Sequence, residues 1–123
     1  MKIEELRIGN IVHIPQTKTN EQIGCIEENG RFVIKGYKSS YSSIECLRPI
    51  PLTEEWLIKF GLTYSNQSRN YSSEKICVFN DLKSINIYYS SYGCDYEFEC
   101  PKYVHQLQNL YFALTGCELQ YVA

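Results

Sequence analysis

The amino-acid sequence predicts an α+β fold in a single domain that spans residues 1–123. Short β-branched segments separated by Gly, Pro and Asn dominate residues 1–51, and residues 76–100 contain a second set of alternating apolar and polar residues. Residues 53–60 and 103–115 instead repeat their apolar side chains every three or four positions, as amphipathic helices do. A chain of 123 residues is long enough to build one such core.

Residues 1–51 are predicted to form an SH3-like small β-barrel or a curled sheet. The Asn29-Gly30 dipeptide favours a two-residue hairpin turn, because both positions accept a positive φ angle. Pro49 and Pro51 lack the amide hydrogen that central sheet pairing needs, so the last strand of this unit is expected to end there. The predicted strands are residues 8–14, 22–27, 31–37 and 44–50, with a polar loop at 16–21.

A short helix is predicted within residues 52–61. Thr53 is a suitable N-cap, and Glu54 and Glu55 occupy the first turn, where the helix dipole favours negative charge. Gly61 is placed to end the helix. One apolar stripe is expected to enter the core: Trp56, Leu57 and Phe60.

Residues 62–75 contain few aliphatic side chains and are predicted to form a long polar loop. Residues 76–123 are predicted to form a three-stranded antiparallel meander followed by the C-terminal helix, with one turn of the meander at Asn80-Asp81. The last strand alternates in polarity, which predicts one face against the core and the other in water. The side chains expected to face water are all acidic: Asp95, Glu97 and Glu99.

The C-terminal amphipathic helix carries the most informative pattern in the chain. Pro101 suits its first turn and Gly116 its end. A projection at about 100° per residue places the apolar residues on one broad face: Tyr103, Val104, Leu107, Leu110, Tyr111 and Leu114. A second row lies on the far side, and it is predicted either to be an interface with another molecule or to be covered by the same chain. Its members are His105, Gln108, Asn109 and Phe112.

No catalytic signature is present, and the protein is predicted not to be an enzyme. The sequence contains no nucleophile elbow, no Cys-His signature and no glycine-rich phosphate loop. A small hydrolase using the carboxylates of residues 95–99 is the least favoured alternative, because no apolar neighbour on that face raises one pKa above the others. Cys94 and Cys100 would lie about 20 Å apart at the two ends of one strand. We therefore expect no metal and no other cofactor.

The charge and the cysteine content limit which partners and which cellular compartment are expected. The net charge is −2 and the pI is about 5.7, so the field that drives binding to long nucleic acids is absent. The N-terminus places Glu4, Glu5 and Arg7 where a secretion signal would need an unbroken apolar run. No membrane association is expected. The six cysteines are therefore expected to be reduced and, in the main, small buried hydrophobes.

Tyrosine is the compositional anomaly, with eleven residues in the chain. Tyrosine, serine and asparagine together are typical of recognition loops, although they also occur in exposed polar loops with tyrosine as a strand former. Tyrosine rings can stack on bases, and nearby Arg or Lys side chains can meet phosphate. The candidate ligand-binding residues are Arg31, Lys35, Tyr37, Tyr41, Tyr64, Arg69, Tyr71, Tyr88 and Tyr92. An SH3-like nucleic-acid-binding module is the alternative interpretation.

Three blocks resemble an uncharacterised family of small proteins from Bacteroidetes genomes, phages and prophages: ELRIGN at 5–10, PIPLTEEWLIKFG at 49–61 and YVHQLQNLYFALTG at 103–116. Cys117 departs from the family's usual pattern, in which a charged or polar residue is more familiar. The family has no established activity, so the resemblance implies a phage or prophage context and transfers no catalytic residue.

Phage accessory proteins of this size commonly bind host proteins, assemble with other phage proteins or sequester nucleotide immune signals. By that analogy we expect a non-enzymatic, homo-oligomeric binding protein in the cytoplasm of a bacterial host. Its expected partner is a nucleotide immune signal or a host protein.

Overall fold

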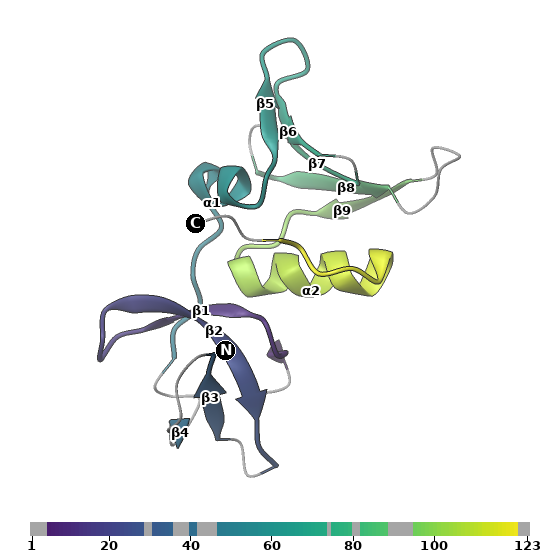
Figure 1. Cartoon of the computed structure of the whole chain (residues 1–123). Coiled ribbons are helices and arrows are strands. Elements are labelled where there is room, and N and C mark those ends of the chain that lie inside the picture. Colours follow the sequence, from purple (N-terminus) through teal and green to yellow (C-terminus); the bar gives the residue numbers. More distant parts are fainter. Residues whose placement is uncertain are drawn as a thin grey trace. The chain divides into compact units, whose positions relative to one another are not determined.

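The computed structural model describes residues 5–28, 31–35, 40–41, 47–73, 75–79, 82–88 and 95–120, except for the side chains at positions 40, 41, 87, 88, 95 and 96. Over these residues the chain is α+β, with two α-helices and antiparallel sheets of four and five strands, which confirms the predicted class (Figure 1). The chain divides into two compact units, one of residues 1–51 with 103–109 and the other of residues 52–102 with 110–123. The predicted β unit and the predicted short helix therefore belong to different units.

The first unit contains a four-stranded sheet in the order β1-β2-β3-β4. Strand β2 pairs with β1 through its first half and with β3 through its second half, with a register shift between Ile23 and Cys25. The strands are β1 (Ile11–Ile14), β2 (Thr19–Ile26), β3 (Phe32–Ile34) and β4 (Ser40–Tyr41). The turn predicted at residues 29 and 30 lies outside the described residues, but Ile26 and Phe32 on either side of it are paired.

The described strands form an open sheet rather than a closed barrel. Beyond β2, the described partner of β1 is an isolated bridge between His13 and Arg48. Pro49 follows Arg48 directly and has no amide hydrogen with which to extend that pairing into a ladder. The core of the unit is nevertheless continuous: Leu6, Val12, Ile14, Ile23, Phe32, Ile34 and Leu47.

The polar loop predicted at residues 16–21 is shorter in the structure, because β2 already begins at Thr19. A turn of four residues, Pro15 to Lys18, joins β1 to β2, and Lys18 adopts a φ of 58°. The first two residues of β2, Thr19 and Asn20, are exposed, so no apolar alternation marks the start of the strand in the sequence.

The second unit begins with α1 (Glu54–Lys59), as predicted. Thr53 is the N-cap residue, although its side chain makes no capping hydrogen bond. Gly61 has a φ of 88°, and the amides of Gly61 and Leu62 donate to the carbonyl oxygens of Ile58 and Leu57. This pair of hydrogen bonds is a Schellman motif, which ends the helix where the sequence predicts. The apolar stripe is buried: Trp56, Leu57 and Phe60.

The second sheet has five strands in the order β5-β6-β7-β8-β9, so it contains two strands more than the three predicted. The extra pair, β5 (Thr63–Ser65) and β6 (Asn70–Ser72), forms a hairpin inside the segment predicted to be a polar loop. Of these six residues only Tyr71 is buried, so the sequence lacks the alternation of apolar and polar residues from which strands are predicted. Strand β6 is nevertheless held by its ladder to β7. The remaining strands are β7 (Ile76–Phe79), β8 (Ser84–Tyr88) and β9 (Asp95–Glu99).

The last helix, α2 (Val104–Thr115), begins later than predicted, so Pro101 is not in its first turn. The preceding residues are extended: Tyr103 bridges Pro51, and the amide of Leu52 donates to the carbonyl oxygen of Lys102. Gly116 has a φ of 73° and ends the helix as predicted. Within the described part of the chain, neither helix has the length and apolar character needed to cross a membrane.

Candidate functional site

The polar row of α2 holds the N-terminal segment of the same chain. Gln108 Oε1 accepts a hydrogen bond of 2.9 Å from the amide of Ile11, and Gln108 Nε2 donates to the carbonyl oxygen of Gly9 at 3.1 Å. The carboxamide thus satisfies one backbone donor and one backbone acceptor next to β1, as a neighbouring strand would. The side chain is fully inside, with 2% of Gln108 exposed.

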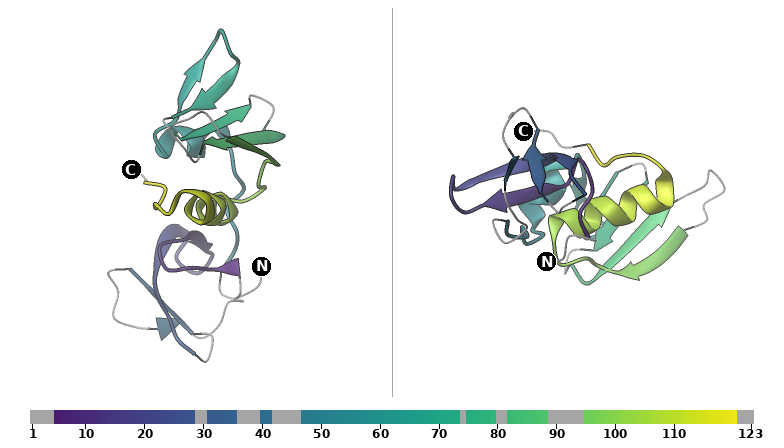
Figure 2. Two further views of the ribbon diagram at one scale, coloured as in Figure 1. Left: turned by 90° about the vertical axis from the view of Figure 1, so that its right-hand side faces the viewer. Right: turned by 90° about the horizontal axis from the view of Figure 1, so that it is seen from below.

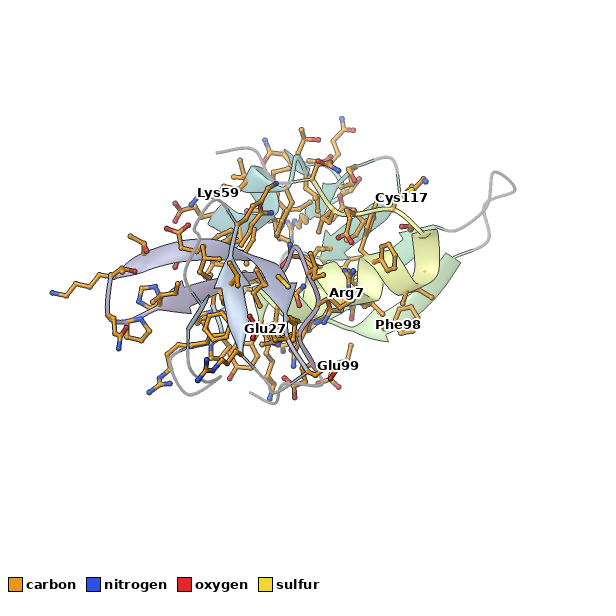
Figure 3. All side chains as sticks on the ribbon, turned by 60° about the horizontal axis from the view of Figure 1, so that its bottom comes forward. Arg7, Glu27, Lys59, Phe98, Glu99 and Cys117 are labelled. Carbon is orange, nitrogen blue, oxygen red and sulfur yellow. The ribbon has the colours of Figure 1, made fainter. Side chains whose placement is uncertain are left out.

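Asn109 adds a second set of hydrogen bonds to the same segment. Its Oδ1 accepts from Arg7 Nε at 2.9 Å and from Asn10 Nδ2 at 2.8 Å, and its Nδ2 donates to the carbonyl oxygen of Glu5 at 2.6 Å. The side chain of Arg7, labelled in Figure 3, also reaches the carbonyl oxygen of Gln108. Asn10 closes the turn by accepting a hydrogen bond from the amide of Arg7.

These contacts decide between the two alternatives for the second row of α2. His105 and Gln108 are buried and Asn109 is half-buried, and each bonds to residues 5–11. The same chain therefore covers these three members of the row, which is the second of the two alternatives. The reason is that the row carries the hydrogen-bond partners that the backbone next to β1 requires. Phe112 differs from the other members of the row because 39% of it is exposed.

His105 is buried, and one of its two ring nitrogens has a hydrogen-bond partner among the described residues. Its Nε2 lies 3.4 Å from Glu5 Oε2, and the ring stacks on Tyr103 with centroids 6.0 Å apart. Its Nδ1 is buried and has no hydrogen-bond partner among the described residues. Burial lowers the pKa of His105, and the carboxylate of Glu5 opposes that shift.

The β5–β6 hairpin brings together three of the predicted ligand-binding residues, and it projects from the rest of its sheet (Figures 1 and 2). Tyr64 is 43% exposed, and its ring centroid lies 4.9 Å from that of the buried Tyr71. Arg69 occupies the connecting turn with a φ of 54°, and its amide donates to the carbonyl oxygen of Ser65. The rest of the turn is exposed and polar: Asn66, Gln67 and Ser68.

Tyr71 is anchored to α1. The carboxylate of Glu54 accepts a hydrogen bond from the Tyr71 hydroxyl. Burial raises the pKa of Tyr71 above 10.0, and the negative charge of Glu54 adds to that shift. The exposed ring of Tyr64 therefore rests on a second ring that is itself fixed in place.

The other predicted ligand-binding residues are not part of the β5–β6 hairpin. Arg31 and Lys35 flank β3 in the first unit, and both are exposed. Tyr37 and Tyr92 lie outside the described residues. Tyr41 in β4 and Tyr88 in β8 are described by their backbone alone.

The described carboxylates and thiols do not gather into a group that could hold a metal ion. Glu97 and Glu99 are exposed on β9, at the edge of the sheet, and no three His, Cys, Asp or Glu residues within the described ranges are arranged to hold a metal ion. Four cysteines are described, and all are reduced thiols rather than members of disulfides. The expectation of buried cysteines holds for two of them and was wrong for the two exposed ones: Cys77 and Cys100 are buried, whereas Cys25 and Cys117 are exposed.

No family model, curated protein or solved structure matches this chain.

Sequence reasoning missed the partners of these side chains. Glu5, Arg7 and Asn10 were not identified as partners of α2, and Glu54 was assigned only to the helix dipole. The sequence contains one signal that could have indicated these contacts: two adjacent carboxamides, at positions 108 and 109, on a helix whose other face is apolar. Adjacent carboxamides predict backbone pairing, but nothing local identifies the segment that they bind.

Proposed function

We propose that this chain is a non-enzymatic binding protein that recognises its ligand through the β5–β6 hairpin. The observation that carries the proposal is the exposed Tyr64 ring packed on the buried Tyr71, with Arg69 in the adjoining turn. A ring that is already held against a neighbour loses little side-chain entropy when it binds. The hairpin is therefore a pre-organised recognition surface.

A nucleotide is the ligand class that fits these side chains best. The face of Tyr64 can stack on a base, and the guanidinium of Arg69 can donate paired hydrogen bonds to a phosphate. The net charge of −2 favours a small anion over a long nucleic acid, because the chain lacks the basic field that long polyanions require. In a phage or prophage context, this function would be the sequestration of a nucleotide immune signal in the host cytoplasm.

A host protein is the second candidate, and the composition of the hairpin tip supports it. Asn66, Gln67 and Ser68 are all exposed, and together with Tyr64 they provide adaptable hydrogen bonds around an aromatic anchor. An SH3-like nucleic-acid-binding module remains the alternative, and its support is the pair of exposed cations that flank β3, Arg31 and Lys35.

The first experiment is native mass spectrometry of the freshly purified protein, followed by calorimetric titration with linear and cyclic mono- and dinucleotides. We expect binding of at least one nucleotide, and Tyr64→Ala or Arg69→Ala should weaken it at least about tenfold. Arg31→Ala is the matched control, because it removes an exposed arginine from the other unit.

The outcomes separate the three candidates. Absence of a retained nucleotide and of any titration signal would exclude the nucleotide version. Salt-dependent binding of single-stranded DNA that is weakened by Arg31→Ala, and not by Tyr64→Ala, would favour the nucleic-acid module. A host protein that co-purifies with the wild type and is lost in Tyr64→Ala would favour the second candidate.

A further inference from the structure

The attachment of residues 5–11 to α2 includes one imidazole, that of His105, and this group lies outside the proposed hairpin site. The His105 side chain is fully buried, and its contact with Glu5 is the only ion pair to α2 in the described part of the first unit. The other contacts between the segment and α2 come from neutral carboxamides and Arg7. The protonation state of His105 is therefore the one property of this contact that changes near neutral pH.

The neutral ring fits the site better than the charged ring. When His105 is neutral, Nε2–H donates to Glu5, and Nδ1 is an acceptor without a partner. When the ring is protonated, Nδ1 becomes a buried N–H donor with no acceptor in the described structure. A buried donor without an acceptor is destabilising, and a buried positive charge adds to that penalty.

Charged groups of opposite sign act on the ring. The carboxylate of Glu5 attracts the protonated form, and it is itself partly exposed, which weakens that attraction through solvent screening. The positive α-amino group of the chain acts in the opposite direction. Tyr103 stacks on the ring, and Arg7 bonds to Asn109 further along the helix.

We infer that His105 is an acid-sensitive latch, which in its neutral form holds residues 5–11 against α2 and on protonation releases them. Gln108 and Asn109, whose carboxamides bond to Ile11, Gly9 and Glu5, follow His105 by three and four residues on the helix. Opening at His105 therefore weakens all three contacts. Burial lowers the pKa of His105 in the closed state below its ordinary value of 6.5. Protons therefore bind the open state first, and the closed state loses stability as pH falls from about 6.5 to the closed-state pKa.

Hydrogen exchange of the Ile11 amide measures the latch directly, because that amide donates to Gln108. The chain has two histidines, so NMR can follow each ring separately. We expect the protection factor of Ile11 to fall by up to about tenfold per pH unit within the window, which is the slope for uptake of one proton. An Ile11 protection factor that is constant while the His105 ring titrates would overturn the inference.

Three variants separate the latch from a merely structural role. His105→Phe keeps a buried ring and removes the titration, so the pH dependence of Ile11 protection should disappear. His13→Phe is the control, because His13 bonds to Asn20 in the β1–β2 hairpin and should leave that dependence unchanged. Glu5→Gln should move the midpoint of the His105 titration to lower pH, and it keeps the test available if His105→Phe does not fold. A pH dependence that persists in His105→Phe would also overturn the inference.

Discussion

The side-chain oxygen of Gln108 accepts a hydrogen bond of 2.9 Å from the backbone amide of Ile11, which lies 97 residues away in the sequence. The same carboxamide donates to the carbonyl oxygen of Gly9. One side chain in the middle of α2 thus bonds to both a backbone donor and a backbone acceptor at the entry into β1.

Gln108→Ala should lower the free energy of unfolding by about 1–3 kcal/mol, because it leaves a buried donor at Ile11 without a partner. Urea denaturation followed by circular dichroism measures the loss. Gln106→Ala, two residues earlier on the same helix and only half-buried, is the matched control and should change stability by less than about 0.5 kcal/mol. Equal losses in the two variants would contradict the assigned role of Gln108.

Gly61→Ala should destabilise the protein by about 1–2 kcal/mol, because an L-residue with a side chain is strained in the left-handed conformation that ends α1. A Cβ at this position would meet no atom within 4 Å, so the effect comes from the backbone alone. Gly61→Asn is the control, since Asn tolerates this conformation better. Thermal denaturation should rank the variants with Gly most stable, then Asn, then Ala.

Tyr71 should contribute stability that is lost at alkaline pH. Burial and Glu54 raise its pKa in the folded state, so the unfolded chain ionises first as pH passes 10.0. The contribution is thus present below that pH and decreases as pH rises through the folded-state pKa. Tyr71→Phe should flatten this part of the stability profile measured by urea denaturation, whereas Tyr64→Phe, at a more exposed ring, should change it less.

Phe112→Ser should loosen a homo-oligomer while leaving the monomer folded, because Phe112 retains 39% exposure whereas the buried members of its row bind residues 5–11. Light scattering coupled to size exclusion, at several protein concentrations, reports the change. Ile58→Ser is a matched control, since Ile58 is exposed on α1. A wild-type protein that is monomeric at all concentrations would remove the basis for this expectation, and a Phe112→Ser variant that unfolds would show that the ring belongs to the core.

The amino-acid sequence by itself determined the features that depend on near neighbours. The apolar stripe and Gly61 predict α1, Gly116 predicts the end of α2, and the alternation around Glu97 and Glu99 predicts the exposed face of β9. Each of these signals acts over one or two turns of chain, where residue type limits backbone conformation and exposure directly. The α+β class follows from the same local patterns.

Only the tertiary structure decided the β5–β6 hairpin and the fate of the polar row on α2. The hairpin has no glycine in its turn and buries only Tyr71, so its strands exist because β7 pairs with β6 and Glu54 binds Tyr71. His105 and Gln108 are polar, and polarity alone predicts exposure. Gln108 is held by backbone groups, and His105 by the Glu5 carboxylate, about a hundred residues away in the sequence. No local pattern specifies which distant donors and acceptors a carboxamide or an imidazole will satisfy.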